Sequence, residues 1–91
     1  MIVDLRSETV TRPTPEMYAA MASAELGDDV LGDDPTVIEL EKAAAEIVGK
    51  DAALFVPSGT MGNQIAVSGW VKPGEAFIVE REAHIVYYES G

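Results

Sequence analysis

The sequence predicts an α/β fold with three helices and two parallel strands, which would belong to an incomplete sheet. Apolar residues recur at helical spacing in three segments, whereas residues 52–56 and 76–80 are short apolar runs of strand length. A glycine-containing turn and a helical pattern separate the two runs, which is the order of a strand, a crossover helix and a parallel strand. Two strands do not form a stable sheet alone. We therefore expect residues 1–91 to be the amino-terminal segment of a longer chain.

Size and charge limit the function further. A chain of 91 residues and 9.7 kDa forms one domain at most. Sixteen acidic and six basic residues give a net charge of −10, which repels nucleic acids and anionic membranes, so we expect neither as a partner. The sequence has no cysteine, which excludes disulfides and thiolate metal sites. No apolar run has the length of a signal peptide or a membrane span, and the predicted location is the cytoplasm.

The first two predicted helices begin with similar residue pairs. A Thr-Pro pair at 14–15 and an Asp-Pro pair at 34–35 each combine a capping side chain with a proline suited to the first helical position. Glycines predict the ends, at Gly27 and Gly49. The apolar stripes are Met17, Ala20, Met21 and Ala24 in the first helix, and Val37, Leu40, Ala44, Ile47 and Val48 in the second. Four aspartates lie between the helices, at a spacing unlike that of an EF-hand, and we predict no metal site.

The turn between the first predicted strand and the third helix is a candidate phosphate site. A helix start presents unpaired N–H groups, and ligands of α/β proteins bind where strands end. The backbone N–H groups of Gly59 and Thr60 and the hydroxyls of Ser58 and Thr60 would donate to a phosphate, and Gly59 would let the anion approach without a Cβ. The alternative is that Ser58 simply caps the helix, which Pro73 and Gly74 would end.

His84 is the single histidine, and it follows the second predicted strand by four residues. Its ring could stack on a planar ligand and exchange protons near neutral pH. Tyr87 and Tyr88 come directly afterwards, where one phenol could face the ligand and the other could pack. The alternatives are an exposed loop histidine and tyrosines that fill an interface.

Hydrogen-bond donors also gather in the opening segment, which we expect to be extended or irregular. Ser7 stands beside Arg6, and Arg12 follows five residues later. Such donors suit a carboxylate, which an arginine can bind through two parallel hydrogen bonds. Taken singly, these side chains are better explained as surface residues.

Four stretches together carry a resemblance to a known family. LRSETVTRPTPEM, GDDVLGDDPTV, AALFVPSGTMGNQ and EAHIVYYESG look like the amino-terminal quarter of the low-specificity L-threonine aldolases, in order and with the expected spacing. These enzymes use pyridoxal 5'-phosphate and have the fold of the aspartate aminotransferases, known as fold type I. The resemblance implies that residues 1–91 are an amino-terminal segment plus the start of the cofactor-binding large domain.

The resemblance also implies a reaction and a set of site residues. The reaction is the cleavage of L-threonine or L-allo-threonine to glycine and acetaldehyde. Ser58, Gly59 and Thr60 would hold the cofactor phosphate, and His84 would stack on the pyridine ring and orient or deprotonate the substrate hydroxyl. Ser7 would contact the substrate carboxylate. Tyr88 would reach the active site of a neighbouring subunit in a homotetramer built as a dimer of dimers.

The lysine that attaches the cofactor is expected beyond residue 91. Lys42, Lys50 and Lys72 do not match the family motif for it, so the 91 residues alone should be inactive. Two other functions stay open. One is a related enzyme of fold type I, such as a β-eliminating lyase, and the other is a non-catalytic module that binds phosphate or a protein.

Overall fold

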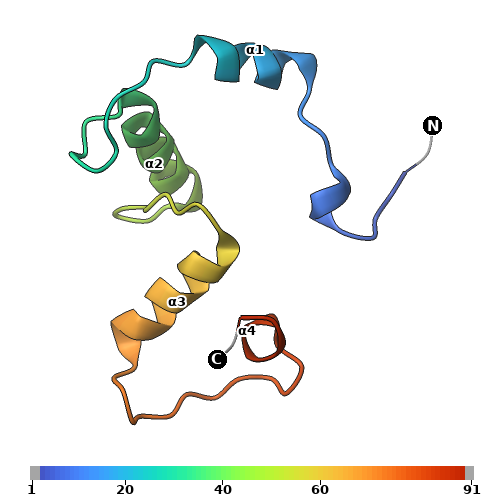
Figure 1. The fold of residues 1–91 in the computed structure, drawn as a ribbon, viewed down its shortest axis with the longest axis vertical. Coiled ribbons are helices and arrows are strands. Elements are labelled where there is room, and N and C mark those ends of the chain that lie inside the picture. The colour runs from blue at the N-terminus through green and yellow to red at the C-terminus, as the bar shows by residue number, and fades with distance from the viewer. Residues whose placement is uncertain (1–2, 90–91) are drawn as a thin grey trace. The chain divides into compact units, whose positions relative to one another are not determined.

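The computed structural model describes residues 3–89 (Figure 1). They fall into two units, divided between Ala53 and Leu54, and each unit is described by itself. The first unit contains a 3₁₀ turn and two helices, and the second contains two helices. These elements are η1 (Glu8–Val10), α1 (Pro15–Ser23), α2 (Pro35–Val48), α3 (Gly59–Trp70) and α4 (His84–Tyr87).

Side-chain caps fix the starts of α1 and α2, as predicted. The Thr14 hydroxyl accepts a hydrogen bond from the Met17 N–H at 3.3 Å, and Asp34 Oδ1 accepts one from the Val37 N–H at 2.9 Å. A proline follows each cap at the first helical position, where a missing N–H group removes no helical hydrogen bond. Both starts therefore depend on residues only three positions apart.

The two helices end differently. Gly49 caps α2 in the left-handed region at φ 65°, which confirms the predicted end. Helix α1 ends at Ser23, before the predicted Gly27. The Ser23 hydroxyl donates to the carbonyl groups of Ala19 and Ala20, at 3.0 and 3.3 Å, and thereby satisfies acceptors in the last turn. The chain is already extended at the next residue, with ψ 135°.

Two hydrogen bonds join the beginning of the loop between α1 and α2 to the start of α2. The Gly27 N–H donates to Asp34 Oδ2 at 2.9 Å, and the Thr36 hydroxyl donates to the Glu25 carbonyl at 2.6 Å. A Cβ on Gly27 would lie 2.4 Å from the Asp33 carbonyl oxygen. Only glycine allows this close approach.

Helix α3 also begins at a predicted cap. The Ser58 hydroxyl accepts a hydrogen bond from the Met61 N–H at 3.1 Å. The helix ends at Trp70, and the predicted stop at Pro73 and Gly74 is a separate turn. In that turn the Glu75 N–H donates to the Lys72 carbonyl at 3.0 Å, and Gly74 has a φ of 91°.

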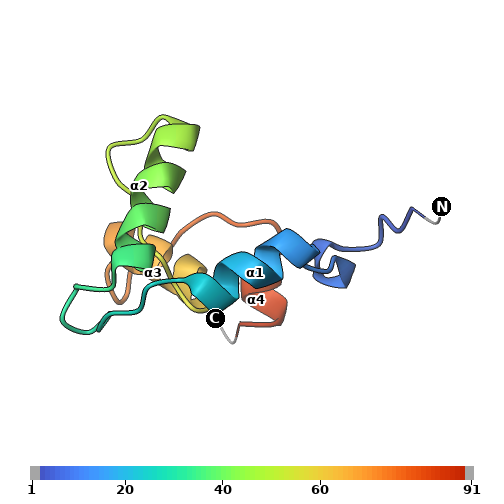
Figure 2. The same cartoon turned by 90° about the horizontal axis from the view of Figure 1, so that it is seen from above.

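The prediction of two sheet strands is wrong. Residues 3–89 contain helices, turns and irregular backbone, with neither a strand nor a sheet (Figure 1 and Figure 2). The runs 52–56 and 76–80 lack regular structure. A strand forms only where a neighbouring strand exchanges backbone hydrogen bonds with it, and residues 3–89 contain no strand that could be that neighbour. The structure therefore corrects the α/β prediction to a set of helices joined by irregular segments.

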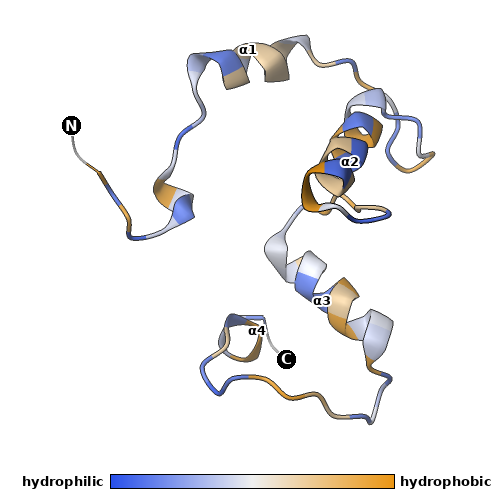
Figure 3. Ribbon diagram, turned by 180° about the vertical axis from the view of Figure 1, so that it is seen from behind, coloured by the Kyte–Doolittle hydropathy of each residue, from blue (hydrophilic) through white to orange (hydrophobic). Residues whose placement is uncertain are grey.

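Most of the predicted apolar surface is uncovered. Ala45 is the one buried hydrophobic residue among those described, and Asp34 is the one buried polar residue. Helix α2 has an apolar and a polar side (Figure 3), but Ile47 on its predicted apolar stripe is 85% exposed. Ile78, in a run expected to be buried, is completely exposed. Within the described residues, no helix combines the length and the apolar character that crossing a membrane requires.

Candidate functional site

The amino terminus of α3 presents two backbone donors. The first helical hydrogen bond runs from the Gly62 N–H to the Ser58 carbonyl at 3.1 Å, and the Ser58 hydroxyl takes the Met61 N–H. The N–H groups of Gly59 and Thr60 precede this bond, so the helix itself offers them no acceptor. Ser58 thus acts as the cap that the alternative interpretation expects, and its cap leaves both amides available.

The surroundings of these donors fit an anion. A Cβ added to Gly59 would meet no atom within 4 Å, and Gly59 and Thr60 are both exposed. The Thr60 hydroxyl adds a side-chain donor, and the positive end of the helix dipole favours negative charge here. Two amides, a hydroxyl and a helix start form a donor set whose chemistry suits a phosphate monoester.

His84 opens α4 and is tied to α3 through one carboxylate. Its Nδ1 lies 3.0 Å from Glu89 Oε1, and Asn63 Nδ2 donates to the same oxygen at 2.9 Å. The two bonds span very different sequence separations, because Asn63 belongs to α3 and is 26 residues from Glu89. The imidazole is therefore joined to the helix that carries the phosphate donors.

The histidine and the glutamate differ sharply in exposure. The side chain of His84 is 69% exposed, whereas that of Glu89 is only 1% exposed. Glu89 Oε2 is buried and makes no hydrogen bond within the described part of the chain. The imidazole is thus open to a ligand while the carboxylate that holds it is shielded.

Tyr88 packs beside His84. Their ring centroids are 4.9 Å apart with an interplanar angle of 32°, and the ring of Tyr87 lies 6.3 Å from that of Tyr88. Both tyrosines line a shallow hollow with Glu82. The structure therefore brings His84 and Tyr88 together, with most of the imidazole surface still exposed.

Ser7 lies in the other unit and bonds locally. Its hydroxyl caps η1 by accepting from the Thr9 N–H at 3.2 Å, and it donates to Glu8 Oε2 at 3.1 Å. Arg6 is paired with Asp4, since its Nε lies 2.9 Å from Asp4 Oδ1, and this guanidinium lowers the pKa of the Asp4 carboxyl. Two of the predicted carboxylate donors, Ser7 and Arg6, are thus engaged within the opening segment.

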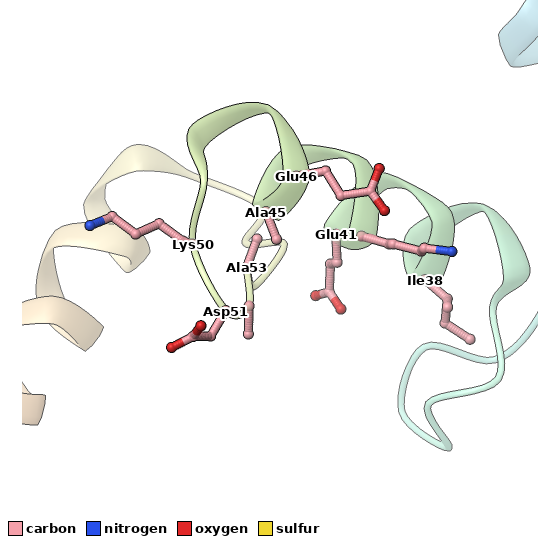
Figure 4. Close-up of a pocket in the computed structure, with 9 residues that line it drawn as sticks. Ile38, Glu41, Ala45, Glu46, Lys50, Asp51 and Ala53 are labelled. Carbon is pink, nitrogen blue, oxygen red and sulfur yellow. The ribbon is translucent and has the colours of Figure 1, made fainter.

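The three lysines are divided between the two units. Lys72 follows α3 at the end opposite Ser58, and a helix of 12 residues is about 18 Å long. Lys42 and Lys50 belong to the first unit, where side chains from α2 and the following loop surround a hollow (Figure 4). That hollow is lined by Ile38, Glu41, Lys42, Ala45, Glu46, Lys50, Asp51, Ala52 and Ala53. None of the predicted site residues lines it.

Sequence reasoning missed Glu89 and Asn63. Glu89 is five residues beyond His84, a separation that does not correspond to one face of a helix, and it follows the end of α4. Asn63 lies within α3, and its position in the helix does not distinguish it from the other polar residues there. No local pattern distinguishes either residue, because their link exists only once α3 and the 84–89 segment approach each other.

Comparisons with known proteins agree with the motifs. Residues 4–91 match the family described as Beta-eliminating lyase. Probable low-specificity L-threonine aldolase 2 from Arabidopsis thaliana is 58% identical over 90 residues, which are 98% of this chain and 25% of that protein. Low specificity L-threonine aldolase from Escherichia coli strain K12 is 50% identical over 90 residues, which are 99% of this chain and 27% of that protein.

A third relative, Low-specificity L-threonine aldolase 1 from Arabidopsis thaliana, is 56% identical over 90 residues, which are 98% of this chain and 25% of that protein. The chain thus spans about a quarter of the length of the curated relatives it matches. The resemblance to low-specificity L-threonine aldolases that the motifs predicted is confirmed by these identities. Because the family match covers nearly all of its residues, the chain belongs to the beta-eliminating lyase family.

Proposed function

We propose that this chain is the amino-terminal segment of a pyridoxal-phosphate enzyme that cleaves L-threonine or L-allo-threonine to glycine and acetaldehyde. The observation that carries the proposal is the link between α3 and His84. The helix that offers free amides at Gly59 and Thr60 is joined, through Asn63 and Glu89, to an exposed imidazole. The names of the relatives, which are 50–58% identical, support the choice of reaction.

Each residue then has a defined task. The N–H groups of Gly59 and Thr60, together with the hydroxyls of Ser58 and Thr60, bind the cofactor phosphate. His84 stacks against the pyridine ring and receives the proton of the substrate hydroxyl as the carbon–carbon bond breaks. When bound, pyridoxal phosphate withdraws electrons from that bond. Ser7 binds the substrate carboxylate, for which its hydroxyl must leave Glu8.

The attaching lysine and the remaining site residues come from sequence beyond residue 91, so the 91 residues alone lack activity. The complete enzyme is a cytoplasmic homotetramer in which Tyr88 reaches a neighbouring subunit. Its substrate is a small β-hydroxy-α-amino acid, and it binds neither nucleic acid nor membranes. The net charge of −10 supports the last point.

The decisive experiment assays the full-length protein that contains this segment. After loading with pyridoxal phosphate, it should release equimolar glycine and acetaldehyde from L-threonine. L-serine serves as the parallel substrate, because a β-eliminating enzyme would release ammonia and pyruvate from it. Elimination from serine without glycine release from threonine would replace the aldolase by the related lyase. A protein that neither retains the cofactor nor acts on either substrate would favour the non-catalytic module.

Replacement of the imidazole tests its role separately. His84→Asn removes the proton acceptor but leaves the donors of α3 unchanged. Turnover should fall by about 100-fold or more, the contribution expected of a general base, while the affinity for pyridoxal phosphate changes less. Unchanged turnover would show that His84 is an exposed residue of α4 without a catalytic role.

A further inference from the structure

Glu89 holds its carboxylate in an unusual way. Both hydrogen bonds to the side chain converge on Oε1, from Asn63 Nδ2 at 2.9 Å and from His84 Nδ1 at 3.0 Å. The other oxygen, Oε2, is buried without a partner within residues 3–89. A buried carboxylate with an unmet oxygen is a poor stabilising element, and such exceptions in folded proteins call for a functional explanation.

The chemistry of the two contacts fixes where the imidazole proton lies. An amide NH₂ group can only donate, so the Asn63 contact makes Glu89 Oε1 an acceptor. An acceptor oxygen 3.0 Å from an imidazole nitrogen requires that nitrogen to carry the proton. The neutral ring of His84 therefore has its hydrogen on Nδ1 and its lone pair on Nε2.

We infer that Glu89 is a positioning residue that sets the tautomer and orientation of His84, and that Asn63 anchors this pair to α3. The inference rests on the proposed function for its catalytic meaning. The lone pair on Nε2 belongs to a side chain that is 69% exposed, so it can meet a substrate from outside. Glu89, at 1% exposure, is shielded from water that would compete for Nδ1.

With this tautomer, His84 can accept the proton that the proposed cleavage releases. The substrate hydroxyl gives its proton to Nε2, its O–H electron pair becomes the second bond of the aldehyde, and the broken carbon–carbon pair stays on the glycine carbon. The imidazolium then shares its Nδ1–H with the Glu89 carboxylate, which stabilises the positive charge. In the opposite tautomer Nε2 would carry a hydrogen and could not accept the proton.

The test is nitrogen NMR of the full-length protein with ¹⁵N-labelled histidine. The His84 signals are assigned by their loss in His84→Asn. In the native protein at a pH where the ring is neutral, Nδ1 should give the signal of a protonated nitrogen and Nε2 that of an unprotonated one. Glu89→Ala should abolish this preference, and it should lower kcat at least about tenfold with little change in KM.

Glu89→Gln and Glu82→Gln make the result specific. The side-chain amide in Glu89→Gln keeps an oxygen for Nδ1, so this variant should preserve the tautomer, and it remains interpretable if the alanine variant fails to fold. Glu82→Gln removes the same charge from the same segment, and the Glu82 carboxylate accepts no hydrogen bond among the described residues. In this variant both the tautomer of His84 and kcat should therefore stay native.

A proton on Nε2 in the native protein, or an Nδ1 proton that persists in Glu89→Ala, would overturn the inference. The NMR result does not require threonine cleavage, so a failed activity assay would remove the proposed function and leave the tautomer test valid.

Discussion

The Thr60 hydroxyl allows the phosphate site to be tested with one substitution. Thr60→Val in the full-length protein replaces the donor by a methyl group of similar size at an exposed position. If the hydroxyl binds the cofactor phosphate, the free energy of pyridoxal-phosphate binding should weaken by about 1–3 kcal/mol. Fluorescence or absorbance titration of the cofactor measures this change. Thr60→Ser is the matched control and should bind normally, whereas equal affinity of the valine variant would contradict the assigned contact.

Gly59 supplies a second test with a separate readout. In Gly59→Ala the new methyl group meets no protein atom within 4 Å, and alanine favours a helix more than glycine does. The melting temperature without cofactor should therefore stay the same or rise, while cofactor affinity falls because the anion meets a Cβ. Unaltered affinity in this variant would show that the phosphate does not approach Gly59 closely.

Residues differ in how far the sequence can reveal their roles. His84 and Thr60 were predicted as candidates because each follows an apolar run at a recognisable distance. Glu89 was not, because its significance comes from an oxygen shared by Asn63 and His84. The convergence of two side chains on one oxygen of a third depends on the tertiary arrangement, which the spacing of residues along the sequence does not reveal.

At the scale of elements, the helix starts were predictable and the strands were not. The caps Thr14, Asp34 and Ser58 each bind an N–H group three residues later, so all the required atoms lie within one short segment. The runs 52–56 and 76–80 have apolar residues typical of strands, but a strand depends on a distant partner. Apolar character alone therefore predicted the wrong element.

Asp34 makes the start of α2 sensitive to acid. Hydrogen bonds from the Gly27 N–H and then the Val37 N–H hold the pKa of Asp34 below its usual value of 3.8. Because the folded pKa is the lower one, this carboxylate contributes its full stabilisation above about pH 4, and the contribution is lost as the pH falls through the folded pKa. Helix content should therefore be measured as the pH is lowered, in the wild type and in Asp34→Asn. Below about pH 4 the wild type should lose more helix than the variant, because asparagine also caps a helix but has no carboxyl group to protonate. Coincident curves would contradict this prediction.

The loop before α2 depends on Gly27. In Gly27→Ala the added Cβ would lie 2.4 Å from the Asp33 carbonyl oxygen and 2.7 Å from the Asp34 Cα, so the backbone must move and the hydrogen bond to Asp34 weakens. We expect the free energy of unfolding of the full-length protein to fall by about 1–3 kcal/mol, as judged by denaturant unfolding. Gly69→Ala, where the Cβ meets nothing within 4 Å, should not destabilise the protein. Equal stabilities of the two variants would argue against a tight loop.

For the whole molecule, exposed apolar surface is the dominant feature. Leu54 is 66% exposed, Trp70 is 90% exposed, and Ile78 is completely exposed. Produced alone, the 91 residues should bind the dye ANS strongly and melt without a cooperative transition, because they bury too little apolar surface to offset the entropy of folding. Calorimetry and dye fluorescence check this. A sharp transition in a monomer would mean that the segment folds independently.

The local caps also affect how the polypeptide acquires its structure during synthesis. Each helix start is complete once the cap and the three following residues have left the ribosome, and proteins emerge from the amino terminus. The nascent chain can therefore form three helical nuclei early, while its hydrophobic side chains are still exposed to solvent. A chaperone that shields such surfaces should consequently be needed most during this early interval of translation.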